Sequence, residues 1–426
     1  MRQQLRAQVT MGQQRGEQDV AKSQEVMRGQ NGRSMVSSSS ISIPTVQSSQ
    51  SNITRGSIGR PGKVGVNYVD IQMEKMPSTA YHYDVTITPV IQKKFLRPAF
   101  EQFNRQFFPK TQMAYDGKSS FYTIQKLSVE SATQEVEIDR GTGKKSFRIT
   151  IKETQDLEVD LSVLRRYSTE RVYDKPMRAL QCLDVVLANP CHNKAVRAGR
   201  SFYMKPEQRY DLTDGYEMWL GLYQAAILGD SPFLNVDISH KSFPSECRLV
   251  DYIQENFRET DASQPLANRT IYGLKEFVKS AYIVYEPPAN FGSFPTSYRV
   301  IDISRESAAS LKVTLDNQVV VTVADYFKSK GYTLKYPNWN CLKVGSSIKS
   351  IHIPIELCKV PAGQAINKND GPRQVQQIVK FSATSTDIRK QKIMTMLSYF
   401  KHNLDLKVQA FGIQIGNDFK VVPMRI

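Results

Sequence analysis

The sequence predicts an α+β protein of several domains that follows a disordered N-terminal tail. Its 426 residues are enough for roughly three domains of ~100–200 residues each. Short runs that alternate apolar and polar residues, typical of antiparallel strands, are separated by segments whose apolar residues recur at helical spacing. Residues 1–60 are rich in Gln, Ser and Arg and hold too few large apolar side chains to offset the entropy of ordering them, so we expect this tail to be disordered.

The charge balance favours a polyanionic partner. The chain has 57 Lys and Arg against 41 Asp and Glu, a net charge of +16. Its five cysteines are an odd and widely scattered set, typical of reduced thiols, and they lack the paired spacing of a zinc site, so we expect no metal or other cofactor. No segment approaches ~18 consecutive apolar residues and the N-terminus lacks an apolar signal core, which predicts no membrane association and a cytoplasmic protein, with the nucleus as the alternative.

Ordered structure is expected to begin near Arg60. The segments VGVNYVDIQM and YHYDVTITP alternate as strands, and AYDGKSSFYT and EVEIDRGTGKKSFRITI indicate hairpins with turns at Asp116-Gly117 and at residues 140–143. One helix between them is predicted to turn an apolar stripe toward a core. The stripe consists of Leu96, Phe100, Phe103 and Phe107.

Three further helices are expected along the rest of the chain outside residues 319–360. PMRALQCLDVVLANP predicts the first, and it is followed by the strands AGRSFYMKP and GYEMWLGLYQAAI. The second is marked by the three-to-four spacing of Cys247, Val250, Ile253 and Phe257. The third should run from Asp387 to Lys401, with a cap at Ser385 or Thr386 and a buried face. That face consists of Ile393, Leu397 and Phe400.

The stretch from Val319 to Val360 carries the clearest functional signal. It predicts a β-branched strand (Val319 to Val323), a short helix and two further strands. Aromatic faces stack on bases and ammonium groups neutralise phosphates, so an aromatic and basic mixture favours a site for single-stranded nucleic acid. A buried aromatic core with a rim of solvated lysines fits the same residues, and composition leaves both interpretations open. The mixture is Tyr326, Phe327, Tyr332, Tyr336 and Trp339 with Lys328, Lys330, Lys335, Lys343 and Lys349.

The same stretch resembles the PAZ domain of Argonaute proteins. VADYFKSKGYTLKYPNWNCLKVG, followed by PIELCKVPAGQA, matches a long pattern of that domain. GRPGKVGVNYVDI, YHYDVTITP and YDGKSSFYT resemble the N domain of the family, and AGRSFYMKP with GYEMWLGLYQ resembles its first linker. VGSSIKS and SATSTDIRKQKIM are most similar to the insect siRNA-class members. The unusual fixed residues of the PAZ-like pattern are Cys341, Pro354, Glu356, Cys358, Gly363 and Gln364.

The resemblance implies an order of domains. After the disordered tail (1–60) would come an antiparallel-sheet N domain (61–168), a helix-and-strand linker 1 (169–240), an OB-like PAZ barrel with an αβ insertion (241–364) and a truncated linker 2 (365–426). No segment resembles the MID domain or the catalytic PIWI domain of the family. We therefore expect this chain not to be an enzyme, because slicing needs metal ions held by clustered carboxylates.

The resemblance also implies a pocket for the 3′ end of a guide RNA. Tyr298 and Tyr326 match tyrosines that contact the terminal phosphodiester, while Asn290 and Thr296 replace a histidine and an arginine. With fewer polar anchors, the pocket would rely more on apolar contact with the terminal sugar, which suits a 2′-O-methylated end. The matched pocket residues are Tyr298, Tyr326, Lys330, Tyr332 (in place of the next tyrosine), Lys349, Ile353 and Leu311 (in place of a phenylalanine).

Two functions follow as hypotheses. In the first, the chain is a small-RNA-binding component of RNA silencing that anchors a guide siRNA, with the N domain assisting duplex handling and RISC-loading proteins as further partners. In the second, it is a protein-interaction scaffold or a competitor of a full-length silencing protein. Binding of a short methylated oligonucleotide would discriminate between them.

Overall fold

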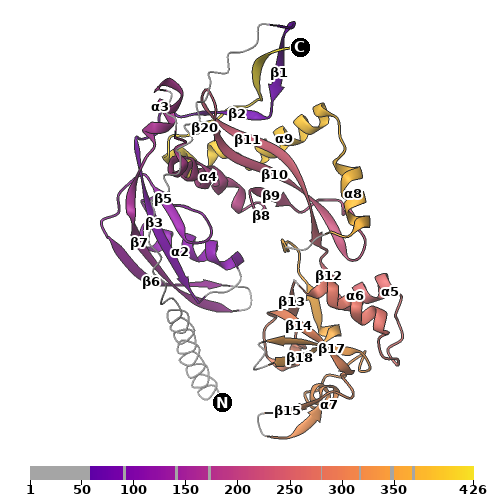
Figure 1. Cartoon of the computed structure of the whole chain (residues 1–426). Coiled ribbons are helices and arrows are strands. Elements are labelled where there is room, and N and C mark those ends of the chain that lie inside the picture. Colours follow the sequence, from indigo (N-terminus) through magenta and orange to yellow (C-terminus); the bar gives the residue numbers. More distant parts are fainter. Residues whose placement is uncertain are drawn as a thin grey trace, which may run out of the picture. The chain divides into compact units, whose positions relative to one another are not determined.

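The computed structural model describes residues 58–89, 93–139, 143–170, 174–279, 281–315, 318–345, 350–366 and 370–426. Residues from Gly59 onward form one compact unit. The predicted disorder of residues 1–60 falls almost entirely outside the described residues and stays a prediction. Helices and antiparallel sheets alternate along the described chain, which confirms the predicted α+β class (Figure 1).

In the first part of the described chain, helix α2 (Leu96–Phe107) packs on one face of a five-stranded antiparallel sheet (Figure 1). Phe100 and Phe103 of α2 are fully buried against the sheet, as the apolar stripe predicts. Phe107 is 39% exposed, so its predicted burial is wrong. Phe107 is the last residue of the helix. The chain leaves the helical path at Phe108, whose carbonyl accepts from the side-chain amide of Asn104. The strands, in the order β4-β5-β3-β7-β6, are β3 (Thr79–Thr88), β4 (Ala114–Tyr115), β5 (Ser120–Thr123), β6 (Ser131–Asp139) and β7 (Lys144–Asp160).

The predicted turn between β4 and β5 is confirmed and has a clear local cause. One carboxylate oxygen of Asp116 accepts from the backbone N–H of Lys118, Ser119 and Ser120 at 2.7, 3.0 and 3.1 Å. Gly117 has φ +83°, a left-handed conformation that glycine adopts without a steric penalty. The other predicted turn, at residues 140–143, lies mostly outside the described residues.

A six-stranded antiparallel sheet follows, covered by helix α4 (Met177–His192). The helix packs on β10 and also contacts β4, β5 and β7. Helix α9 (Thr386–Phe400) supplies the predicted side chains Ile393, Leu397 and Phe400 to the same core. Ser385 caps α9 by accepting from the N–H of Ile388 at 3.4 Å. The strands, in the order β20-β2-β11-β10-β9-β8, are β2 (Tyr68–Gln72), β8 (Val196–Ala198), β9 (Ser201–Met204), β10 (Tyr216–Leu228), β11 (Pro232–Pro244) and β20 (Gln414–Ile415).

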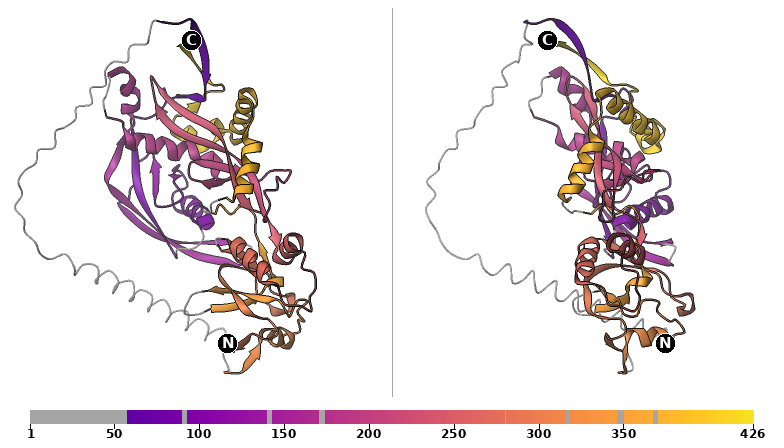
Figure 2. Two further views of the ribbon diagram at one scale, coloured as in Figure 1. Left: turned by 45° about the vertical axis from the view of Figure 1, so that its right-hand side comes forward. Right: turned by 90° about the vertical axis from the view of Figure 1, so that its right-hand side faces the viewer.

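The first and last strands of the compact unit pair with each other. Strand β1 (Pro61–Val66) lies antiparallel to β21 (Lys420–Arg425), and both views of Figure 2 show the yellow C-terminal strand beside the indigo β1. The remaining connecting helices are α3 (Ser162–Glu170), α8 (Pro372–Ser382), α10 (Leu406–Ala410), η1 (Lys93–Phe95) and η4 (His402–Leu404).

A second six-stranded antiparallel sheet carries the region with the functional signal. Its core also contains Tyr216 and Met218 of β10 and Leu212, which precedes that strand. Helices α5 (Leu249–Phe257) and α6 (Asn268–Val278) pack on the same core. An inserted segment follows β14 and comprises β15 (Lys312–Thr314), β16 (Val320–Thr322) and α7 (Val323–Ser329). The strands, in the order β12-β19-β13-β14-β17-β18, are β12 (Cys247–Arg248), β13 (Tyr282–Tyr285), β14 (Thr296–Ser307), β17 (Asn340–Gly345), β18 (Ser350–Pro354) and β19 (Cys358–Val360).

Two predicted boundaries in this region are wrong. Cys247 lies in strand β12, paired with Val360, so the helix begins at Leu249. Ile253 is fully buried as predicted, whereas Val250 and Phe257 are only partly buried against the same core. Val323 begins helix α7 instead of continuing the strand. The cause is a cap, because the hydroxyl of Thr322 accepts from the N–H of Asp325 at 3.0 Å. The buried face of α5 consists of Leu249, Tyr252 and Ile253.

Among the described helices, none combines the length and apolar character that a membrane span requires.

Candidate nucleic-acid interface

A small aromatic cluster lies where the inserted segment meets the second six-stranded sheet. Phe327 of α7 is 5% exposed and stacks on Phe291 of η2 (Ala289–Phe291), with ring centroids 5.2 Å apart and an interplanar angle of 25°. Tyr326 is half-buried and stands edge-on to both rings, at 6.4 Å from Phe291 and 5.5 Å from Phe327. The helix therefore buries one aromatic ring as an anchor and leaves the next one partly open to solvent.

Two tyrosines of the sheet belong to the same neighbourhood. Tyr285, at the end of β13, is half-buried and packs on the cluster. Burial raises its pKa, and the neighbouring Cys358, Tyr326 and Tyr298 raise it further. Tyr298 on β14 is also half-buried, and burial raises its pKa as well. Phenol groups from three different elements thus lie close together, and the raised pKa values of Tyr285 and Tyr298 keep these two protonated and able to donate hydrogen bonds at neutral pH.

Tyr332 has a different environment, because its hydroxyl is already bonded within the protein. It donates to Oε1 of Glu356 at 3.2 Å, and burial followed by the Glu356 charge raises its pKa. Glu356 is only 6% exposed and also accepts from the backbone N–H groups of Lys335 (3.1 Å) and Tyr336 (2.6 Å). The ring of Tyr332 lies edge-on to Phe327, with centroids 6.3 Å apart, so its aromatic body lines the cluster while its hydroxyl holds the following turn.

The end of α7 places a cation beside these rings. Lys330 is exposed at the C-terminal cap of α7, and its carbonyl accepts from Nδ2 of Asn290 at 2.6 Å. This bond ties η2 to the end of α7, and it uses the side chain that replaces the expected histidine. Gly331 follows with φ +80°, and a Cβ there would meet Asn290 Nδ2 at 3.1 Å, so the turn favours glycine.

The remaining predicted pocket residues lie in different parts of the domain. Leu311 is half-buried in the aromatic cluster. Ile353 is 4% exposed, lies opposite Leu342 and belongs to the core of the sheet. Lys349 lies outside the described residues. Tyr285 was not predicted as a site residue. The one sequence signal for it was its position at the end of the strand YIVY, just before the loop that carries Asn290.

A metal or nucleophilic centre finds no support in the described residues. No group of three or more His, Cys, Asp or Glu side chains among them could hold a metal ion. All five cysteines are free thiols, and burial raises the pKa of Cys341 and Cys358 in this region. Such thiols are poor nucleophiles because they stay protonated.

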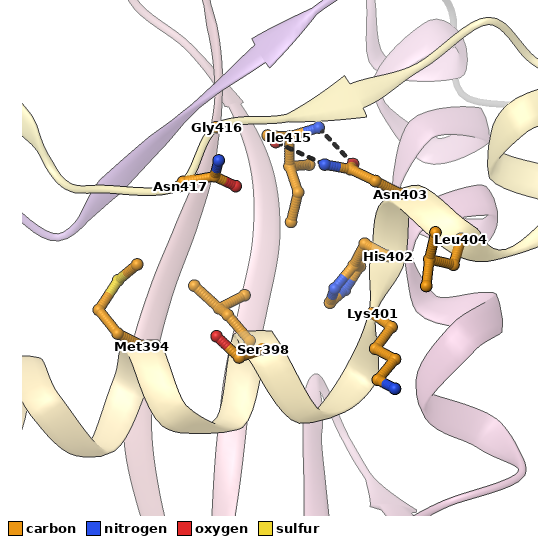
Figure 3. A pocket seen from close by; sticks show the side chains of 10 residues that line it. Met394, Ser398, Lys401, His402, Asn403, Leu404, Ile415, Gly416 and Asn417 are labelled. Carbon is orange, nitrogen blue, oxygen red and sulfur yellow. Dashed lines mark hydrogen bonds between the residues drawn. The ribbon is translucent and has the colours of Figure 1, made fainter.

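A separate hollow of about 300 Å³ lies between α9, η4 and β20 (Figure 3). Its wall is rigid, because Asn403 donates to the carbonyl of Ile415 at 2.9 Å and accepts from its N–H at 2.8 Å. His402 is 1% exposed at the back, where Nε2 lies 3.0 Å from Oε1 of Gln224, and burial lowers its pKa to about 4. None of the predicted RNA-binding residues lines this hollow.

Comparisons with known proteins define the class of this chain. Sequence profiles match the N-terminal domain of argonaute at residues 60–187, the Argonaute linker 1 domain at residues 197–245 and the PAZ domain at residues 250–381. The chain therefore belongs to the Argonaute family and carries its N-terminal, linker 1 and PAZ domains. The domains matched within this sequence are the N-terminal, linker 1 and PAZ domains, and the PIWI domain is not among them.

Three individual proteins are similar to parts of this chain. The chain is 48% identical over 395 residues to protein argonaute-2 of Drosophila melanogaster, covering 90% of this chain and 32% of that protein. The structure of Kluyveromyces polysporus Argonaute with a guide RNA has a TM-score of 0.56 and 17% identity, covering 88% of this chain and 46% of that one. A Drosophila Argonaute PAZ domain in complex with 3′-end 2′-O-methylated RNA is 38% identical, with a TM-score of 0.26, covering 28% of this chain and 99% of that one. The chain spans about a third of the length of the curated relatives it matches.

Proposed function

We propose that the PAZ domain of this chain anchors the free 3′ end of a guide siRNA and thereby serves RNA silencing. The observation that carries the proposal is the half-open aromatic cluster, in which Tyr285 of β13 and Tyr326 of α7 meet, with Tyr298 of β14 next to Tyr285 in the sheet. A base can stack on an exposed aromatic edge, and a neutral phenol can donate to a phosphate oxygen. The match to the PAZ domain supports this use of the cluster.

The proposed roles differ between residues. Tyr326 and Tyr298 donate to the terminal phosphodiester, and Leu311 provides an apolar surface for the terminal sugar. Lys330, exposed beside the cluster, neutralises a backbone phosphate without reading the end. Tyr332 contributes its ring while Glu356 retains its hydroxyl.

Larger roles of the chain are part of the same proposal. Its 48% identity to Drosophila argonaute-2 supports siRNA as the guide class, and the matched N-terminal domain supports a part in duplex handling. Cytoplasmic RISC-loading proteins would be its partners. Strand-separation rates of a labelled siRNA duplex, measured with and without residues 60–187, test the N-domain role.

The central test compares RNA ends. Binding of 5′-labelled single-stranded RNA to the full chain is followed by fluorescence anisotropy, with a free or a blocked 3′ end. Tyr326→Ala should weaken binding of the free-ended RNA by about 5- to 150-fold, the equivalent of ~1–3 kcal/mol, and should leave the blocked RNA unchanged. The matched control is Tyr272→Ala, which removes a 70% exposed tyrosine from α6 outside the cluster. Equal weakening of both RNAs by Tyr326→Ala would show an ordinary basic and aromatic groove that does not read an end.

A further inference from the structure

Phe294 is a large apolar side chain that the protein leaves 65% exposed, on the loop between η2 and β14. We propose that it is an additional stacking platform, which holds the base of a nucleotide upstream of the 3′-terminal one. The inference rests on the proposed function and adds a residue that lies outside the predicted pocket. It implies that the site reads more than the terminal nucleotide.

Both flanks of Phe294 belong to the aromatic cluster. Phe291, three residues earlier, stacks on Phe327, and Thr296, two residues later, pairs in register with Tyr285. Because consecutive Cα atoms are ~3.8 Å apart, the Cα of Phe294 lies within about 8 Å of that of Thr296 and about 11 Å of that of Phe291. Phe294 therefore lies on the chain directly beside the cluster.

The loop holds the ring outward instead of letting it collapse onto the core. Gly292 adopts φ +61°, the left-handed conformation that reverses the chain after η2. The hydroxyl of Thr296 donates to the carbonyl of Phe294 at 3.0 Å, and Pro295 between them restricts the backbone. Since Asn290 also ties η2 to Lys330, the loop is fixed at both ends. A base that stacks on a pre-positioned ring loses less conformational entropy than one that must order it.

The surroundings of the ring favour a nucleic acid over an apolar protein surface. Residues 290–298, NFGSFPTSY, contain no acidic side chain that would repel a phosphate. Of the exposed residues that flank Phe294 in the loop, Ser293 and Thr296 are polar and Pro295 is the one small apolar neighbour, so the ring does not join a broad apolar patch. Arg299 on β14 is exposed near the other end of the loop. Its guanidinium lies 5.7 Å from the ring centroid of Tyr282, so it is a cation on the adjoining strand and not a direct contact of Phe294. A single exposed aromatic face suits the stacking of one base.

The test combines substitution of Phe294 with removal of a single base from the RNA. Fluorescence anisotropy of the full chain uses 5′-labelled single-stranded RNA with a free 3′ end, and a series in which one abasic nucleotide is moved stepwise upstream from the terminus. Phe294→Ala should weaken binding of intact RNA by about 5- to 150-fold, whereas Phe294→Trp should retain it. The difference between Phe294→Ala and the unmodified protein should vanish for one abasic position, where there is no base to stack. Tyr272→Ala, on α6, should bind every RNA like the unmodified protein.

The outcomes separate this inference from the proposed function. If the unmodified protein prefers a free 3′ end but Phe294→Ala binds intact RNA equally well, the stacking platform is overturned and the proposed function stands. A loss that persists at every abasic position also overturns it, because no base is then involved. If the unmodified protein shows no preference for a free end, the proposed function fails and this inference fails with it. Unchanged circular dichroism of Phe294→Ala establishes that a loss is not a folding defect.

Discussion

Two aromatic groups in the PAZ region have similar composition and opposite roles. In the core of the sheet, Trp339 is 1% exposed and lies 4.1 Å from the ring of Tyr336, whose hydroxyl accepts from Gln254 at 3.1 Å. In the cluster at the inserted segment, Tyr285 and Tyr326 are only half-buried. The difference teaches that the aromatic string between positions 326 and 339 is shared between a core and a surface. The two interpretations that composition left open are therefore each correct for a part of it.

The largest effect on stability should come from a substitution in the buried aromatic group, at Trp339. Trp339→Ala should lower the local free energy of unfolding by about 3–5 kcal/mol, because it leaves a cavity in a close-packed core. Tyr326→Ala should cost on the order of 1 kcal/mol, since its ring is half exposed. Urea-dependent hydrogen exchange of peptides from β17 measures both. Similar costs for the two substitutions would erase the distinction between core and surface.

Trp339 also offers a control for its own substitution. Its indole N–H has no hydrogen-bond partner among the described residues, so Trp339→Phe removes volume without breaking a bond. We expect it to cost less than Trp339→Ala. A cost as large as that of the alanine variant would show that the indole N–H makes a stabilising interaction.

The next effect concerns the carboxylate that lies between the two groups. Glu356→Ala should destabilise the region by about 1–3 kcal/mol, because it leaves the partly buried N–H groups of Lys335 and Tyr336 without their acceptor. Glu306→Ala removes an exposed glutamate of the same domain and should have little effect. The measurement is urea-dependent hydrogen exchange at residues 334–340. A double-mutant cycle with Tyr332→Phe should show coupling, and additive costs would contradict the bond between the two side chains.

Much of this fold could be predicted because its signals are local. The stripe of Phe100 and Phe103, the Asp116 turn and the Ser385 cap each depend on residues within a few positions of one another. One wrong boundary arises where a non-local contact decides, because pairing with Val360 holds Cys247 in a strand, whereas the other follows from the local cap that Thr322 provides.

The site was predictable only in part, for the same reason. The strand YIVY favours a buried interpretation of Tyr285, and only the approach of α7 to β13 makes it a neighbour of Tyr326. The hydroxyl of Tyr332 is taken by Glu356, which is 24 residues further along the chain. Spacing in the sequence gives no sign of that bond.

A smaller effect is expected at the cap that presents the exposed ring. Thr322→Ala removes the acceptor for the N–H of Asp325 and should destabilise α7 by ~1 kcal/mol. Because α7 carries Tyr326, the affinity for free-ended RNA should also fall, but less than in Tyr326→Ala. Hydrogen exchange of residues 323–329 and anisotropy measure the two effects, with Thr333→Ala, an exposed threonine of the same segment, as the control. Unchanged hydrogen exchange in Thr322→Ala would show that the Thr322 cap does not stabilise the helix that carries Tyr326.

The smallest effect on stability, and a purely electrostatic effect on binding, belongs to Lys330. Its side chain is exposed, and the bond from Asn290 reaches its backbone carbonyl, so Lys330→Ala should leave hydrogen exchange unchanged. Binding should weaken for free and blocked RNAs alike, because a phosphate contact carries no information about the end. The slope of log affinity against log salt concentration should become shallower by roughly 0.7 to 1, the contribution of one phosphate. Anisotropy at several salt concentrations gives the slope, and Lys279→Ala, an exposed lysine at the end of α6, should leave it unchanged. A loss confined to free-ended RNA would move Lys330 from the basic rim into the end-reading group with Tyr326.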